Sequence, residues 1–172
     1  LSSGLVRTDL LSQVSGAAPH GTGTFVTNSF TPPSNSLLVV AVMAMEQSGS
    51  TDPSGDISVS GGGWTYTAGV TIGSAASFSI GLRIYTAPVS TGASMTLTLD
   101  LAARSARFYA VSVVAYTGYD TSTPTGATGT VVDTASPDGS QSITLSGAPA
   151  TTSEVFAALG IDKETLGVTP GG

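Results

Sequence analysis

The chain of 172 residues has the length of one domain, and only 9% of its residues are Asp, Glu, Lys or Arg, whereas an ordinary soluble domain carries roughly 25%. Five basic residues stand against eleven acidic ones, for a net charge of −6. This balance leaves no basic surface for the phosphates of a nucleic acid, so we expect no nucleic-acid partner. The absence of cysteine excludes disulfides and zinc–thiolate sites. Ser, Thr and Gly take the place of charge, which favours β-strands over surface helices.

The first residues, 1–23, differ in pattern from the rest. Their apolar residues fall at spacings that predict a short helix: Leu5, Val6, Leu10, Leu11 and Val14. Residues 15–23 form a small-residue linker that holds the only histidine, His20. We therefore expect an N-terminal arm and linker at 1–23, followed by one domain at 24–172. The apolar residues of the arm are expected to cover a sheet edge of this domain or to pack on a neighbouring subunit, and the sequence favours neither.

From residue 24 onward the chain alternates strand and turn patterns. Residues 37–45 are apolar at odd-numbered and at even-numbered positions alike, which predicts a central strand covered on both faces. Residues 94–101 alternate, with Met95, Leu97 and Leu99 among the side chains expected to face inward. Further strands are predicted at 24–30, 57–60, 64–67, 78–86, 107–117, 141–145 and 154–161. About eight strands without helical patterns between them predict an all-β, antiparallel β-sandwich of jelly-roll or Greek-key type, with a short N-terminal arm.

The chain shows no segment that would anchor it in a membrane, because its longest apolar run is about half of the ~20 residues that a spanning helix requires. It begins at Leu1 rather than Met and stops in a turn-like Pro-Gly-Gly sequence, so we expect a trimmed or partial chain at its C-terminus.

No pattern of catalytic residues stands out. The lone His20 lies in the linker and no G-x-S-x-G elbow occurs, so a serine hydrolase is not expected. The glutamates Glu46, Glu154 and Glu164 show no recognisable pairing for glycoside hydrolysis. We therefore expect a protein that is not an enzyme and that carries no cofactor.

Two weak candidate sites remain. Asp52 and Asp56, in the segment TDPSGD, are oxygen ligands of the kind that calcium takes, although aspartates beside Pro and Gly more often stabilise turns. The aromatic Trp64, beside three glycines, and Tyr66 are candidates for stacking on a sugar ring. Tyr119 with Asp120, in a loop, is the second such candidate. A core or sheet-face position is the alternative for all these aromatics.

Four segments occur in a familiar order: SFTPPSNSLLVVAV, GGGWT, TAPVSTGASMTLTLD and FYAVSVVAYTGYDTSTPTGATG. In this order the chain, over residues 24–162, resembles a β-sandwich module of tailed-phage virion proteins, especially minor tail and fibre-like proteins. The resemblance implies a structural, decoration or receptor-contacting role and brings no catalytic residues. It also implies further strands after GVTPGG, where this sequence ends.

We therefore expect a structural protein of a bacteriophage particle, displayed on the virion surface or otherwise extracellular. It would serve as a capsid decoration, minor tail or fibre-like component that associates with itself and with other virion proteins, and host attachment would be among its tasks. The alternatives are a carbohydrate-binding module that recognises a cell-surface glycan and a subunit of a secreted cell-surface filament.

Overall fold

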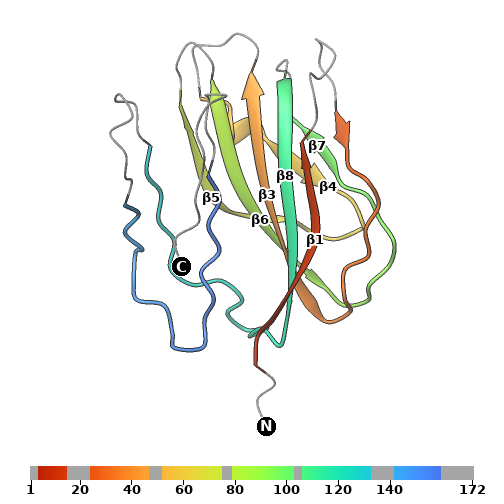
Figure 1. Ribbon diagram of the computed structural model, residues 1–172, viewed down its shortest axis with the longest axis vertical. Coiled ribbons are helices and arrows are strands. Elements are labelled where there is room, and N and C mark those ends of the chain that lie inside the picture. Colours follow the sequence, from red (N-terminus) through yellow and green to blue (C-terminus); the bar gives the residue numbers. More distant parts are fainter. Residues whose placement is uncertain are drawn as a thin grey trace.

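The computed structural model describes residues 4–14, 24–46, 52–74, 79–102, 106–132 and 142–159, and these form an antiparallel β-sandwich (Figure 1). The larger sheet has the strand order β1-β8-β3-β6-β5, and the smaller sheet has the order β2-β7-β4. In the large sheet β1 spans Val6–Val14, β8 Ala106–Thr117, β3 Ser36–Glu46, β6 Ile80–Val89 and β5 Thr67–Ser74. In the small sheet β2 spans Phe25–Val26, β7 Thr98–Asp100 and β4 Ser58–Ser60.

The order of pairing is that of a jelly roll. Among the described strands, β1 pairs with β8, β2 with β7 and β3 with β6, as in a jelly roll. The strand β5 lies beside β6 in the large sheet and is not paired with β4. The only described helix is a short 3-10 turn, Ser54–Asp56, and none in the described residues is long and apolar enough to cross a membrane. The predicted fold class is therefore confirmed.

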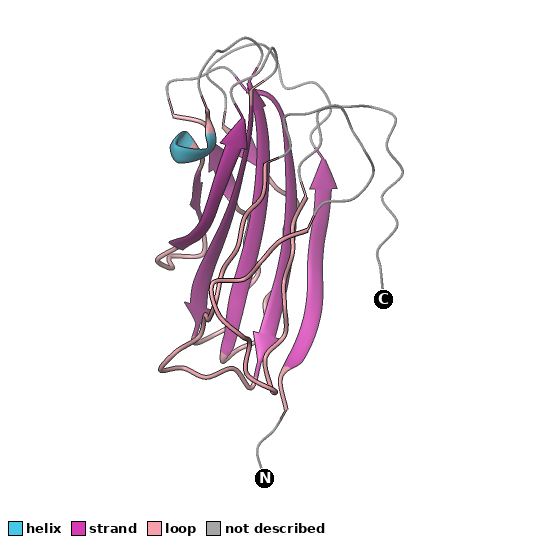
Figure 2. Cartoon of the chain, turned by 90° about the vertical axis from the view of Figure 1, so that its left-hand side faces the viewer, coloured by secondary structure: helices cyan, strands magenta, loops and turns pink. Residues whose placement is uncertain are grey.

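The main core fills the space between the two sheets, which Figure 2 shows from the side. The predicted alternation around β7 is confirmed, because Leu97, Leu99 and Leu101 are fully buried while Thr96 is exposed. From the opposite sheet, alternate residues of β3 and β8 enter the same core: Leu38, Val40, Val42, Ala44, Tyr109, Val111, Val113 and Ala115. Phe25 of β2 stacks on Tyr109 of β8, with ring centroids 6.1 Å apart, and so joins the two layers.

The N-terminal segment is a strand, so the predicted short helix is wrong. The strand β1 pairs antiparallel with β8 along the edge of the large sheet, and its register shifts between Asp9 and Leu11. The extra residue is a bulge, and it breaks the period-2 alternation so that Leu10 and Leu11 both pack against the core. Because the bulge breaks the alternation, the apolar residues of this segment fall at spacings that resemble those of an amphipathic helix. His20 lies outside the described residues.

Other predicted strands agree with the structure to different degrees. The doubly apolar segment 37–45 lies within β3, and the segment 107–117 lies within β8. The segment 24–30 gives only the two residues of β2 and a bridge between Phe30 and Met95. The strand predicted at 64–67 is wrong, because β5 begins at Thr67 and continues to Ser74.

The two strands predicted near the C-terminus are also wrong. Residues 142–159 contain no strand. Their apolar residue Phe156 packs against the face of the large sheet instead of extending one of its ladders. An apolar segment has the same composition whether it joins a sheet edge or covers a sheet face, so the pattern did not distinguish the two.

Replacing Leu38 by Ala should lower the free energy of unfolding by about 2–5 kcal/mol, because this fully buried side chain lies in the centre of the core. Chemical denaturation of the parent and the variant measures the difference. The matched control is Leu159→Ala, whose side chain is 65% exposed and whose loss should change stability little. Equal effects of the two substitutions would contradict the burial described above.

Candidate functional site: the outer face of the large sheet

The large sheet is apolar on its outer face as well as on its inner face. Leu37 and Val39 of β3 lie opposite Tyr116 and Val114 of β8, and all four side chains are buried. We call these four residues the outer cluster. The small sheet packs on the other face, so the outer cluster is covered by different parts of the chain: Leu5, Ile84, Tyr119 and Phe156 pack against it.

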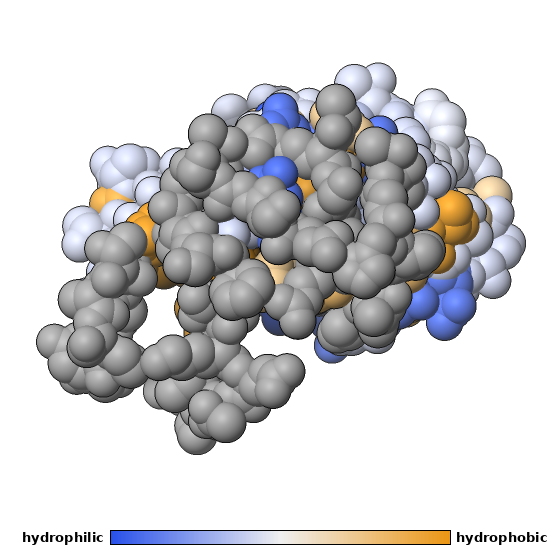
Figure 3. All heavy atoms as spheres, turned by 90° about the horizontal axis from the view of Figure 1, so that it is seen from above, coloured by the Kyte–Doolittle hydropathy of each residue, from blue (hydrophilic) through white to orange (hydrophobic). Residues whose placement is uncertain are grey.

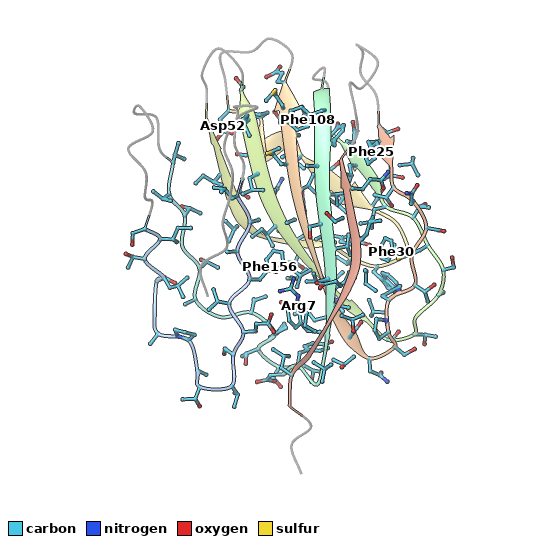
Figure 4. All side chains as sticks on the ribbon, in the orientation of Figure 1. Arg7, Phe25, Phe30, Asp52, Phe108 and Phe156 are labelled. Carbon is cyan, nitrogen blue, oxygen red and sulfur yellow. The ribbon has the colours of Figure 1, made fainter. Side chains whose placement is uncertain are left out.

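The segment that follows β8 contributes Tyr119 and Phe156 to this cover. Within residues 118–132 and 142–159 the chain is extended or turned but forms no strand, and Figure 1 shows much of it to the left of the large sheet, on the side where β5 lies. Its two described parts lie side by side, because the amide of Ser146 donates to the carbonyl oxygen of Thr128 at 2.8 Å. Figure 4 shows Phe156 near Arg7 in front of the large sheet.

Glu154 is the polar anchor of this segment. The hydroxyl of Tyr116 donates to its Oε1 at 2.9 Å, and the guanidinium of Arg7 approaches the same oxygen at 3.4 Å. Arg7 also pairs with Asp9 at 2.9 Å. The Arg7 and Glu154 side chains are 43% and 36% exposed, so their ion pair contributes only about 0–1 kcal/mol. The bond from the buried Tyr116 is the more important of the two.

Burial and the neighbouring carboxylate together change the acidity of Tyr116. Burial is the largest cause, and the hydrogen bond to Glu154 adds to it, so that the pKa of Tyr116 rises from 10.0 to about 12. The folded state therefore holds the phenolic proton more tightly than the unfolded chain does. This contribution to stability is complete below pH 10 and is lost as the pH rises toward about 12.

Replacing Glu154 by Gln should lower the pKa of Tyr116, but not to its ordinary value, because burial remains while the negative charge is removed. Alkaline titration of the tyrosinate absorbance measures the shift, and Tyr116→Phe identifies which step belongs to Tyr116. The control is Asp120→Asn, since Asp120 makes its hydrogen bonds to Ser122 and Thr123. The same titration curve in the parent and in Glu154→Gln would contradict the hydrogen bond between Tyr116 and Glu154.

A surface hollow adjoins this anchor along β1. It is lined by Arg7, Asp9, Leu10, Leu11, Ser12, Ser112 and Val113. The guanidinium of Arg7 is already bonded to two carboxylates, so its charge is largely balanced inside the chain. The hollow therefore offers hydroxyl groups and apolar contact but no excess positive charge.

Trp64 and Tyr66 lie on the opposite side of the large sheet from the outer cluster. Both are half-buried and pack against the main core. The hydroxyl of Tyr66 donates to the carbonyl oxygen of Gly61 at 3.2 Å, and burial raises the pKa of Tyr66 to about 12. Both aromatic side chains therefore hold the glycine turn against the sandwich in this structure.

The glycine turn itself has a specific backbone requirement. Gly62 and Gly63 have φ angles of 63° and 73°, a combination that residues with a side chain rarely adopt and that is typical of a type I′ turn. A Cβ atom at Gly62 would lie 2.8 Å from the Trp64 ring, whereas at Gly63 it would meet nothing within 4 Å. The Trp64 ring thus occupies space that only a glycine at position 62 leaves open.

These two glycines provide a matched test of the Trp64 position. The substitution Gly63→Ala should cost only the backbone strain, about 1–2 kcal/mol. The substitution Gly62→Ala should cost about 1–3 kcal/mol more, because its methyl group also collides with the Trp64 ring. Chemical denaturation measures both losses, and Trp64 fluorescence should change in Gly62→Ala alone. Equal losses would mean that the ring does not pack over Gly62.

Tyr119 and Asp120 are not brought together with Trp64 and Tyr66. Tyr119 packs against the outer cluster, whereas Trp64 packs against the main core. Asp120 accepts hydrogen bonds from the Ser122 amide at 2.8 Å and from the Thr123 hydroxyl at 2.8 Å. These bonds, with the Ser122 amide first, lower the pKa of Asp120. The four residues proposed for glycan contact therefore form two separate groups.

Asp52 stabilises a turn in the structure. Its Oδ1 accepts a hydrogen bond from the amide of Ser54 at 2.8 Å, at the start of the 3-10 turn that ends at Asp56. The carboxylate lies where a side chain at Gly73 of β5 would have to be. Among the described residues, no three His, Cys, Asp or Glu side chains come together as metal ligands. Figure 4 shows Asp52 near the upper end of β5.

Sequence reasoning missed two polar anchors. One is the set of contacts that Glu154 makes with Tyr116 and Arg7. The other is Arg83 of β6, which donates to the carbonyl oxygens of Gly55 at 3.0 Å and Ile57 at 2.9 Å. The Tyr85 hydroxyl also donates to Ile57, and the Arg83 guanidinium lies 5.1 Å from the Tyr85 ring centroid. The signal for this anchor was a charged residue on the strand face that also carries Tyr85, Ala87 and Val89.

No protein-family model, curated protein or solved structure matches the chain.

Proposed function

We propose that this chain is a non-enzymatic structural protein of a bacteriophage particle, displayed on the virion surface as a capsid decoration, minor tail or fibre-like component. The single observation that carries the proposal is where the resembling segments lie in the fold. LLVVAV lies in β3, GGGWT makes the glycine turn, and FYAVSVVAYT lies in β8. The resemblance therefore follows the framework of the sandwich and is not confined to one loop.

The surface of the segment that follows β8, residues 118–132 and 142–159, supports an assembly role. Of the large apolar side chains that the described residues expose, most come from this segment: Val131, Val132, Ile143, Val155 and Leu159. Figure 3, which looks down from the top of Figure 1, shows hydrophobic atoms at the surface on the left, the side on which Figure 1 places this segment, and others on the right. Single exposed apolar residues are ordinary, but a concentration of them in one extended segment suits contact with other proteins.

Glycan binding through the candidate aromatics is less favoured by the geometry. An aromatic platform must present one face of the ring to the sugar. Trp64 and Tyr66 instead pack against the core, and the Tyr66 hydroxyl is engaged by Gly61. An assembly role makes no such demand on these residues, so it accounts better for their positions.

Immunogold electron microscopy with antibodies against the purified chain tests the proposal on particles from the source culture. We expect gold labels at a fixed location on phage capsids, tails or fibres, because a displayed module is accessible on the intact particle. The control is the same antibody preparation after absorption on the purified chain, which removes the specific antibodies and should abolish the labelling. Unlabelled particles, together with no binding of the purified chain to capsid, tail or filament proteins, would overturn the proposal.

A further inference from the structure

The two sheets end in four edge strands, and an edge strand presents unpaired backbone N–H and C=O groups to other chains. The large sheet ends in β1 and β5, and the small sheet ends in β2 and β4. Proteins usually protect such edges with charges, proline, bulges or very short strands. The four edges of this sandwich differ in how far they are protected.

Three of the edges carry clear protection. The strand β1 contains the charged Arg7 and Asp9 and is interrupted by the bulge at Leu10. The strand β2 has two residues and β4 has three. None of these edges offers a long, regular and uncharged ladder to a partner.

The strand β5 is different. Its eight residues, TAGVTIGS, include no charged residue and no proline. Among the described strands it is hydrogen-bonded to β6 alone. Gly69 is exposed, and since glycine has no side chain, its exposure is that of the backbone. A register shift between Ala68 and Thr71 interrupts the ladder, and the Asp52 carboxylate lies against Gly73, but regular pairing with β6 resumes from Thr71 to Ser74.

We propose that β5 is a self-association edge, at which it pairs antiparallel with the β5 strand of a second copy. Two identical strands can pair antiparallel about a two-fold axis. Two-fold symmetry is the commonest symmetry of homo-oligomers. Each copy carries a net charge of −6, so two copies repel one another over most of their surfaces. The β5 strand itself has no charged side chain, the carboxylate of Asp52 lies against Gly73 near its end, and its Thr, Val and Ile side chains suit cross-strand pairs. The pairing joins the two large sheets into one continuous sheet.

This inference rests on the assembly role of the proposed function, for which it names one interface. A charge placed on the edge should abolish the pairing, because the two-fold axis brings both new charges together. Sedimentation velocity over a range of concentrations should show a dimer for the parent chain. The substitution Thr71→Lys should weaken the dimer by about tenfold or more. Its matched control, Ser60→Lys, places the same charge at an exposed position of β4 and should leave the dimer unchanged.

Single cysteines provide a second test that does not depend on a charge, since the parent chain has no cysteine. In an antiparallel self-pair, the residue at the two-fold axis lies opposite itself, at a Cβ separation of about 4.5–5.5 Å that small movements bring within disulfide range. Cysteines at the exposed positions Thr67, Gly69 and Thr71 should give cross-linked dimers under mild oxidation, most efficiently at the position nearest the axis. Cysteine at Ser60 should give none.

The outcomes separate this inference from the proposed function. A parent dimer that is insensitive to Thr71→Lys, with no cross-linking from the β5 cysteines, overturns the β5 interface and leaves self-association through another surface. A parent chain that stays monomeric at all concentrations overturns the interface and self-association together. The immunogold experiment judges the virion role in either case, because it does not require self-association.

Discussion

The strand β3 is apolar on both faces, and the arrangement of the rest of the chain follows from that constraint. One face is covered by the small sheet, with side chains such as Leu38 and Val40 in the main core. The other face carries Leu37 and Val39, and a two-layer sandwich has no third sheet to cover them. The chain after β8 supplies that cover, with Phe156 as its apolar contact and Glu154 as its polar anchor.

This constraint explains which parts of the fold were predictable. A doubly apolar run such as residues 37–45 and a strict alternation such as Met95 to Leu101 report the environment of each residue directly, so these strands could be placed from sequence. The bulge at Leu10 and the glycines of β5 could not, because one inserted residue or a missing side chain weakens the periodicity on which such predictions depend. The C-terminal strands were predicted wrongly because covering a sheet face and joining a sheet edge require the same composition.

The candidate site was less predictable than the fold, and for a different reason. The contacts of Glu154 with Tyr116 and of Arg83 with Gly55 join residues that are distant in the sequence. Glu154 is not unusual in its local segment, and the charge of Arg83 on an apolar strand face does not identify its partners, so no short motif reveals these contacts. The aromatics around the glycine turn were conspicuous in the sequence because Trp64 is the only tryptophan. Their partial burial in the core became apparent only in the folded chain.

The pairing of β1 with β8 also affects how the protein is made. Val6 lies opposite Thr117, so β1 cannot take its place until almost the whole sandwich has been synthesised. At ordinary rates of translation the wait is on the order of ten seconds. Contacts between strands so far apart in the sequence also carry a large loop-closure entropy and are typical of slowly folding β proteins. During that interval β1 has no partner, and the β8 strand of another chain could pair with it, so domain-swapped dimers are the characteristic misfolded product that this topology favours.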